Sequence, residues 1–226
     1  LPIFIFSVIF SSSLNQMSLS KAQENAEASL VEMDEKLDDI YTQSLRAAKN
    51  LSNNYILSRS FLDHSINPNT IYLMLYQASD SIDPSPVVNL YDATGMLVYT
   101  INAPTLGPQQ MPLNWGILRE VRETKNAAIR MNTSQESEYA LMAANAINYR
   151  GIRVGYLTIG HPAENLQDVL QGLVKQDANF NVLGKQGRAI FTKDGLSPSE
   201  EEALRLQVIY PKQEDFAARM SEFGED

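Results

Sequence analysis

The first part of the chain is dominated by one helical pattern. Apolar side chains recur every three or four residues, which places them on a single stripe of an α-helix. Between residues 3 and 67 there is neither glycine nor proline, so no helix breaker interrupts the pattern. We expect one helix over residues 20–58, about 58 Å long at 1.5 Å per residue. The stripe consists of Leu30, Met33, Leu37, Ile40, Tyr41, Ala48, Leu51 and Tyr55.

The middle of the chain changes from this helical period to the alternation of β-strands. A short helix over residues 70–78, capped by Asn69, comes first. Segments rich in Gly, Pro, Asn, Asp and Ser then separate several strand-like runs. The predicted elements are strands over 87–92 and 96–101, a helix over 113–125, and strands over 127–132, 138–148 and 152–160.

This order of elements predicts an α+β fold with an antiparallel five-stranded sheet. We expect the long helix to cover one face of the sheet, and the short helix and loops to cover the other. Alternation places Tyr139, Leu141, Ala143 and Ile147 on one face of their strand. After residue 160, a helix over 162–177 and a second strand-turn-strand pattern predict a smaller second α+β lobe.

The first ten residues are apolar apart from Ser7 and carry no charge. Ten helical residues rise about 15 Å, which is about half of a bilayer core. The pattern fits the buried start of a soluble helix, the core of a signal peptide, or the outer end of a membrane helix. We favour the membrane helix.

Composition narrows the function classes. The chain has 226 residues with 18 Lys and Arg against 27 Asp and Glu, a formal charge of −9, which argues against nucleic-acid binding. It contains no cysteine, so disulfides, thiolate metal sites and cysteine nucleophiles are excluded. With two histidines, His64 and His161, a multi-histidine metal centre is excluded as well.

No catalytic or cofactor motif is present. The sequence lacks a phosphate-binding loop, a nucleophile elbow, a zinc-protease helix and a dinucleotide fingerprint. We interpret His64, next to Asp63, as a surface residue, and His161, before Pro162, as a loop residue. Asp80, Asp83 and Asp92 lack the spacing of a calcium loop, so we expect no metal site.

The order of these elements resembles the Cache type of extracytoplasmic sensor domain, a relative of the PAS fold. The residues that carry the resemblance are the apolar start, the long helix, the hairpin over 87–99 with Tyr91-Asp92-Ala93-Thr94-Gly95 at its turn, and the strand pair over 140–160. The resemblance covers about residues 1–192. Such domains occur in bacterial sensor histidine kinases, chemoreceptors and related membrane proteins.

The resemblance implies a double-Cache organisation. Residues 1–15 would be the end of a transmembrane helix, 16–60 a long signalling helix, 61–161 the membrane-distal lobe, and 162–226 a linker helix with a partial or reduced membrane-proximal lobe. The implied function is extracytoplasmic sensing for a bacterial transmembrane protein, in the first place a sensor histidine kinase. This segment would itself be no enzyme and would need no cofactor. It would bind a small solute and signal by a shift of its long helix.

The resemblance also implies a solute site enclosed by the sheet of the distal lobe and the crossover helix. It places six residues near that site. Asn145 is the single polar residue on an otherwise apolar strand face, and its amide needs a partner if it is buried. Each residue also has a purely structural explanation, either core packing or a surface ion pair. The six are Tyr91, Trp115, Arg119, Arg122, Tyr139 and Asn145.

The sequence departs from the amino-acid-sensing members of the family. Those members carry an arginine followed closely by Trp and Tyr on the crossover helix, whereas here Trp115 precedes Arg119. A sugar or a small organic acid is therefore favoured over an amino acid as the ligand. We also expect a homodimer in the full receptor, attached to the bacterial cell membrane by the N-terminal helix. The alternative is a protein-interaction or dimerisation module without a small-molecule ligand.

Overall fold

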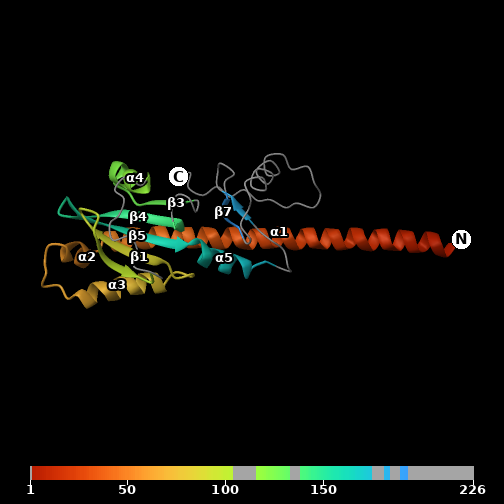
Figure 1. Cartoon of the computed structure of the whole chain (residues 1–226), viewed down its shortest axis with the longest axis horizontal. Coiled ribbons are helices and arrows are strands. Elements are labelled where there is room, and N and C mark those ends of the chain that lie inside the picture. The colour runs from red at the N-terminus through yellow and green to blue at the C-terminus, as the bar shows by residue number, and fades with distance from the viewer. Residues whose placement is uncertain (1, 104–115, 133–137, 175–180, 184–188, 193–226) are drawn as a thin grey trace.

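The computed structural model describes residues 2–103, 116–132, 138–174, 181–183 and 189–192. A single long helix runs along an α/β body and projects beyond it toward the N-terminus (Figure 1). The fold is α+β, as predicted, with a long N-terminal helix and an antiparallel five-stranded sheet. The helices are α1 (Pro2–Ser52), α2 (Tyr55–Ser60), α3 (Pro68–Asp80), α4 (Gly116–Thr124) and α5 (Ala163–Gln171). The strands are β1 (Val87–Asp92), β2 (Leu97–Ile101), β3 (Ala128–Met131), β4 (Tyr139–Tyr149), β5 (Ile152–Pro162), β6 (Asn181–Leu183) and β7 (Ala189–Thr192).

Helix α1 packs on the sheet through one apolar stripe. The buried positions follow steps of three and four residues, which is the period predicted from the sequence. They contact strands β4 and β5, the two central strands that follow the crossover. Full burial of a Leu or Ile side chain contributes about 1.5–3 kcal/mol, so this stripe is a main source of stability. The buried stripe consists of Ser29, Met33, Leu37, Ile40, Ser44, Ala48, Leu51 and Ser52.

The predicted end of the long helix is wrong. Helix α1 begins at Pro2 and ends at Ser52, and a separate short helix, α2, follows. Asn54 is the N-cap of α2, because its side-chain oxygen accepts hydrogen bonds from the amides of Ile56 and Leu57. A side chain that caps a new helix competes with continuation of the preceding helix. Helix α1 therefore ends six residues before Ser58.

Helix α3 also differs from its prediction in cap and position. Asn67 rather than Asn69 is the N-cap, and Pro68 occupies the first turn, where its missing N–H is not needed. Ile71 and Leu75 of α3 belong to the same buried cluster as Ala48 of α1. Both helices therefore lie on one face of the sheet, so the prediction that the short helix covers the opposite face is wrong.

The sheet has the order β2-β1-β5-β4-β3, and all neighbouring strands are antiparallel. Strands β4 and β5 form the longest pair. Their turn contains Arg150 and Gly151 with φ values of 51° and 81°, the left-handed pair typical of two-residue hairpins. The predicted hairpin connection is confirmed. The β6–β7 hairpin forms a separate two-stranded sheet, and residues 193–226 of the expected second lobe lie outside the described residues.

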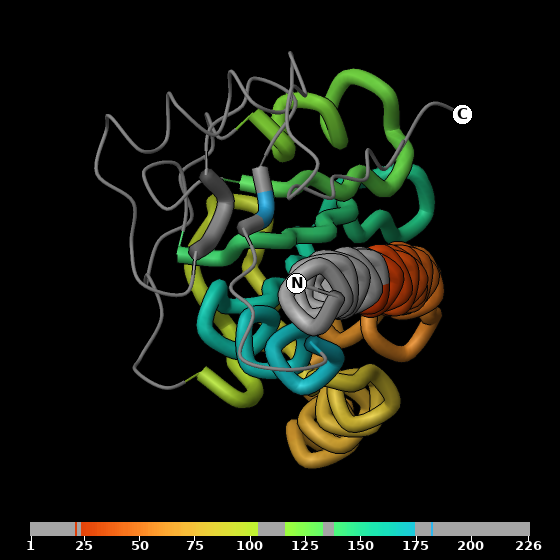
Figure 2. The backbone as a smooth tube through the Cα atoms, turned by 90° about the vertical axis from the view of Figure 1, so that its right-hand side faces the viewer, coloured from red at the N-terminus to blue at the C-terminus, as the bar shows by residue number. Residues whose placement is uncertain are grey.

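The two faces of the five-stranded sheet carry different helices. Figure 2 shows α4 on one side of the strands and α1 with α3 on the other. We call the two sides the α4 face and the α1 face. Ile117, Leu118 and Val121 of α4 pack against the first, while Leu51 and Leu57 pack against the second.

Within the described ranges, we find no helix that combines the length and the apolar character needed to cross a bilayer. Helix α1 is long enough, with 51 residues. The N-terminal membrane helix therefore stays a prediction.

Candidate ligand-binding face

The α4 face of the sheet has small and polar side chains at its centre. Register places Asn89 of β1 between Thr100 of β2 and Thr158 of β5, and Thr158 next to Ala144 of β4. Residues that are directly paired across antiparallel strands point to the same face. The centre of this face is therefore a row of one amide, two hydroxyls and a methyl group.

Tyrosines surround this row. Tyr91 is next but one to Asn89 on β1, and it pairs with Tyr156 on β5. The ring of Tyr139 lies directly over Gly160, where an added Cβ would come within 2.6 Å of the ring. Glycine at 160 is thus required by the close approach of an aromatic ring to the strand.

A hydrogen-bonded network joins these groups. The Thr100 hydroxyl donates to Asn89 Oδ1 over 2.7 Å, and Asn89 Nδ2 donates to the Tyr139 hydroxyl over 3.4 Å. Asn89, Tyr91, Tyr139 and Thr158 are each at most 4% exposed. We call these four residues and Thr100 the polar cluster. Buried polar groups of this kind require partners, and here they supply most of them to one another.

The tyrosines of the polar cluster are uncharged at neutral pH. Burial raises the pKa of Tyr91 to about 12, although hydrogen bonding with Thr158 and Asn89 opposes the rise. Burial likewise raises the pKa of Tyr139. Both hydroxyls therefore stay protonated and serve as neutral donors and acceptors. The cluster therefore contains hydrogen-bonding groups but carries no charge from its tyrosines.

The structure brings together two of the six residues expected at the site. Tyr91 and Tyr139 lie in the polar cluster on the α4 face. Arg119 and Arg122 lie on α4, but both are exposed. Trp115 lies outside the described residues. A role for any of the six in ligand binding stays a prediction.

Asn145 lies on the α1 face, away from Tyr139. Its Nδ2 donates to Ser52 Oγ over 2.6 Å, and its Oδ1 accepts from the amide of Ala146 over 2.9 Å. Helix α1 thus supplies the partner that its buried amide needs. The prediction that Tyr139 shares a face with Leu141 is wrong, because the register of β4 shifts between these two residues. Such a bulge moves one side chain to the opposite face.

Sequence reasoning missed Asn89, Thr100 and Thr158. Asn89 is flanked by Val88 and Leu90, and Thr158 by Leu157 and Ile159. A polar residue inside an apolar strand run was the signal that drew attention to Asn145, and it would have identified these positions too. Their hydrogen bonds across strands could not be seen without the register.

His161 is not a loop residue as predicted. It lies in β5 with no exposed surface, and its Nε2 is 2.8 Å from Ser44 Oγ of α1. Among the described residues, its Nδ1 finds no hydrogen-bond partner. Burial lowers the pKa of His161 to about 4, so the ring is neutral at physiological pH. The sequence concealed this burial because β5 extends past the predicted strand end to Pro162.

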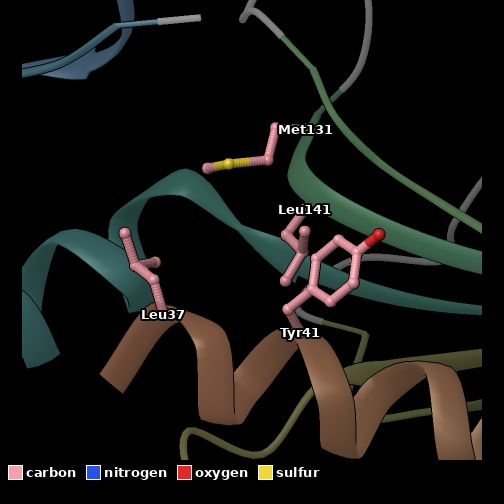
Figure 3. A pocket seen from close by; sticks show the side chains of 4 residues that line it. All are labelled: Leu37, Tyr41, Met131 and Leu141. Atoms are coloured by element: carbon pink, nitrogen blue, oxygen red, sulfur yellow. The ribbon is translucent and has the colours of Figure 1, made fainter. Parts of the chain in front are cut away.

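A small apolar pocket lies between α1 and the edge of the sheet. Figure 3 shows Leu37 and Tyr41 of α1 facing Met131 of β3 and Leu141 of β4. The space among them leaves no room for a water molecule. Burial, with Glu120 and Asp38 nearby, raises the pKa of Tyr41. This pocket does not offer the polar groups that a soluble guest requires.

Two of the three carboxylates considered for cation binding, Asp83 and Asp92, have other partners. Asp92 Oδ1 accepts from the amides of Thr94 and Met96 and so closes the β1–β2 turn. Asp83 is 2.8 Å from Lys36 Nζ of α1. In the part of the chain that the structure describes, no three acidic or imidazole groups are close enough to hold a metal ion.

Three solved structures illustrate which proteins share this fold. One is a domain of a putative sensory box/GGDEF family protein from Vibrio parahaemolyticus, with a TM-score of 0.60, 13% identity, and coverage of 85% of this chain and 82% of that chain. Another is the extracellular domain of the putative histidine kinase vpHK1S-Z8, with a TM-score of 0.58, 15% identity, and coverage of 85% and 79%. The ligand-binding domain of the Campylobacter jejuni chemoreceptor Tlp3, in complex with 4-methylisoleucine, has a TM-score of 0.52, 15% identity, and coverage of 80% and 75%.

No family model matches the chain, and the comparison with curated proteins found no match. At identities near 15%, the solved structures establish the fold and leave the ligand open. The agreement extends over most of the chain in each case. This chain therefore has the fold of the extracellular sensor and ligand-binding domains of chemoreceptors and histidine kinases, as its Cache-type resemblance predicts.

Proposed function

We propose that this chain is the extracytoplasmic sensing domain of a bacterial membrane signalling protein, and that it binds a small solute on the α4 face. The parent protein is in the first place a sensor histidine kinase. This segment has no catalytic role in the proposal. Binding would be transmitted through α1, which runs along the sheet and continues beyond the body (Figure 1).

The observation that carries the proposal is the polar cluster on the α4 face. An apolar core has no need of Asn89, Thr100, Thr158 and two tyrosine hydroxyls at the centre of a sheet face. Burying such groups costs free energy unless each is paired, and the Asn89–Tyr139 hydrogen bond is long at 3.4 Å. A solute with hydroxyl or carbonyl groups would improve this pairing when it displaces the Tyr139 ring.

The ligand class is the part of the proposal that rests on sequence. The sequence favours a sugar or small organic acid, because the arginine-tryptophan-tyrosine pattern of amino-acid sensors is missing. The Tlp3 domain, however, has the same fold and was solved with 4-methylisoleucine. A screen must therefore include branched amino acids beside sugars and organic acids.

Membrane attachment through residues 1–15 and homodimerisation belong to the same proposal. The apolar start of α1 supports attachment, and the length of α1 supports a role in carrying motion or dimer contacts. The signalling helix would then comprise residues 16–60, the distal lobe residues 61–161, and the proximal part residues 162–226.

A protein-interaction module is the second candidate function. A cluster of large apolar side chains is exposed on α2 and α3 and in the turn between them, and patches of this kind mark contact surfaces. Tyr72 and Tyr76 stack there with ring centroids 6.5 Å apart. The exposed residues are Tyr55, Ile56, Leu62, Tyr72, Leu73 and Tyr76.

Thermal unfolding in the presence of solutes tests the proposal. A ligand at about 100 times its Kd adds about 2.7 kcal/mol, which raises the Tm of a chain this long by about 5–10 °C. The panel contains neutral sugars, small organic acids and branched amino acids. Asn89→Ala should abolish the rise, whereas Asn148→Ala, an exposed asparagine on β4, should preserve it.

Absence of any rise across the panel, combined with binding of a partner protein that Tyr72→Ala abolishes, would favour the interaction module instead.

A further inference from the structure

Two buried hydrogen bonds join α1 to the central strands of the sheet. Ser44 Oγ lies 2.8 Å from His161 Nε2 of β5, and Ser52 Oγ accepts from Asn145 Nδ2 of β4 over 2.6 Å. All four side chains are at most 8% exposed. Every other buried position on the stripe of α1 between these serines is apolar, namely Ala48 and Leu51.

The spacing of the two contacts matches on both elements. Ser44 and Ser52 are eight residues apart, which is about 12 Å along an α-helix. Asn145 pairs with Leu157, and His161 lies four residues further along β5, which is about 13 Å along a strand. One axial position of α1 therefore satisfies both hydrogen bonds at once.

If α1 were shifted along its axis by one turn, neither hydrogen bond could form. A shift by one turn, four residues, would bring Ile40 or Ala48 opposite His161. A shift that brings Ile40 opposite His161 also brings Ala48 opposite Asn145, whereas the opposite shift moves the end of α1, Ser52, past Asn145. Both buried polar side chains would then face apolar groups and lose their partners, which is costly.

We propose that the pairs Ser44–His161 and Ser52–Asn145 form a register lock, which holds α1 in one axial position on the sheet and makes its displacement an all-or-none step. Hydrophobic packing also resists such a shift, but a buried polar side chain that loses its partner adds the cost of an unsatisfied group, which the apolar positions do not add. Buried polar pairs specify register in other helical assemblies in the same manner.

The strands that carry the lock also carry the centre of the α4 face. On β4, Ala144 points to the α4 face and Asn145 to the α1 face, and on β5, Thr158 and His161 divide in the same way. A displacement of these strands would therefore directly change the hydrogen bonds of both serines. The lock itself is a property of α1 and the sheet, and it stands whether or not a solute binds beneath α4.

Spin-label distances test the lock directly. Because the chain has no cysteine, Glu35→Cys and Ile152→Cys introduce two unique labelling sites on exposed residues of α1 and of the β4–β5 hairpin. Ile152 lies at the end of the sheet near Ser52, so the distance between the labels follows the helix axis. The lock predicts one narrow distance distribution in the otherwise unchanged chain.

The decisive variant replaces both pairs by apolar ones, Ser44→Ala with His161→Leu and Ser52→Ala with Asn145→Leu. Removing both partners of a buried pair leaves no unsatisfied group, so this variant should fold. We expect a second distance about 5 Å away from the first, one helical turn, in about a tenth of the molecules or more. Should the fourfold variant fail to fold, Ser44→Ala with Ser52→Ala serves instead, with the same expectation.

Ser58→Ala is the matched control. Ser58 is a buried serine whose hydroxyl donates to Tyr55 O within its own helix, so its loss should leave the single distance unchanged. A single, unshifted distance in both test variants would overturn the register lock. A second distance in the control as well would also overturn it, because the shift would then follow from general destabilisation.

Discussion

At the residue scale, the described structure contains two sets of buried polar side chains on opposite faces of one sheet. Asn89, Tyr139 and their neighbours face α4, while Asn145 and His161 face α1. Each set has a chemical consequence that an apolar core would lack. The first supplies hydrogen-bonding groups to the solute site that we propose, and the second ties α1 to the strands beneath it.

His161 gives the domain a defined response to acid. The unfolded chain takes up a proton at this ring near its ordinary pKa of 6.5, whereas the folded chain does so only near pH 4. Between these values the unfolded state binds more protons, so stability falls as the pH is lowered from about 6.5 to about 4, by about 3 kcal/mol in all. Urea unfolding at a series of pH values measures this loss.

The control for this response is Ser44→Ala with His161→Leu, which removes the titrating ring and its partner together. Its stability should be nearly constant over the same interval. If both proteins lose stability equally between pH 6.5 and pH 4, a group other than His161 is responsible.

Gly160→Ala tests the packing of Tyr139. The new Cβ would lie 2.6 Å from the ring, so the ring must move, and we expect a loss of about 1–3 kcal/mol in the free energy of unfolding. In a Tyr139→Ala background the same substitution should cost little, because the clash is gone. An equal loss in both backgrounds would mean that the strand backbone, rather than the ring, requires glycine.

Arg119→Ala tests an expectation taken from the sequence. Because Arg119 is exposed on α4, its removal should change stability by less than about 0.5 kcal/mol. We expect it to weaken binding of whichever solute raises the Tm, and calorimetric titration measures the affinity. Lys125→Ala, an exposed lysine directly after α4, is the control for lost charge. Unchanged affinity in Arg119→Ala would remove this residue from the site.

At the element scale, the break between α1 and α2 depends on one side chain. Asn54→Ala removes the oxygen that accepts from Ile56 and Leu57, and we expect a loss of about 1 kcal/mol in thermal or urea unfolding. Asn53→Ala is the matched control, since Asn53 is exposed and its side chain does not cap α2. Similar losses in the two variants would mean that the cap does not determine the start of α2.

The elements themselves could be predicted from the sequence, but the details of their ends could not. The period of α1 and the alternation of the strands depend on residues that are close along the chain. Both patterns can therefore be identified in the amino-acid sequence. The bulge after Tyr139 and the extension of β5 to His161 depend on pairing between strands. The same holds for the site, because the family resemblance places Tyr91 and Tyr139 there, whereas the pairing of Asn89 with Thr158 depends on the register between strands.

At the scale of the whole molecule, one layer of strands separates a candidate binding surface from a long rod. Figure 2 shows this division, with α4 on one side and α1 on the other. Successive residues of β4 and β5 point alternately to the α4 face and to the α1 face. These two strands therefore connect the two sides directly. This is the simplest physical route by which a solute beneath α4 could alter the position of α1.

Backbone amide chemical shifts measure whether a solute on the α4 face also changes the surroundings of α1. In a titration with a solute that raises the Tm, we expect the largest changes at Asn89, Ala144 and Thr158, followed by smaller changes at Ser44 and Ser52 on α1. Changes confined to the exposed residues of α3, or spread evenly over the surface, would contradict solute sensing on the α4 face.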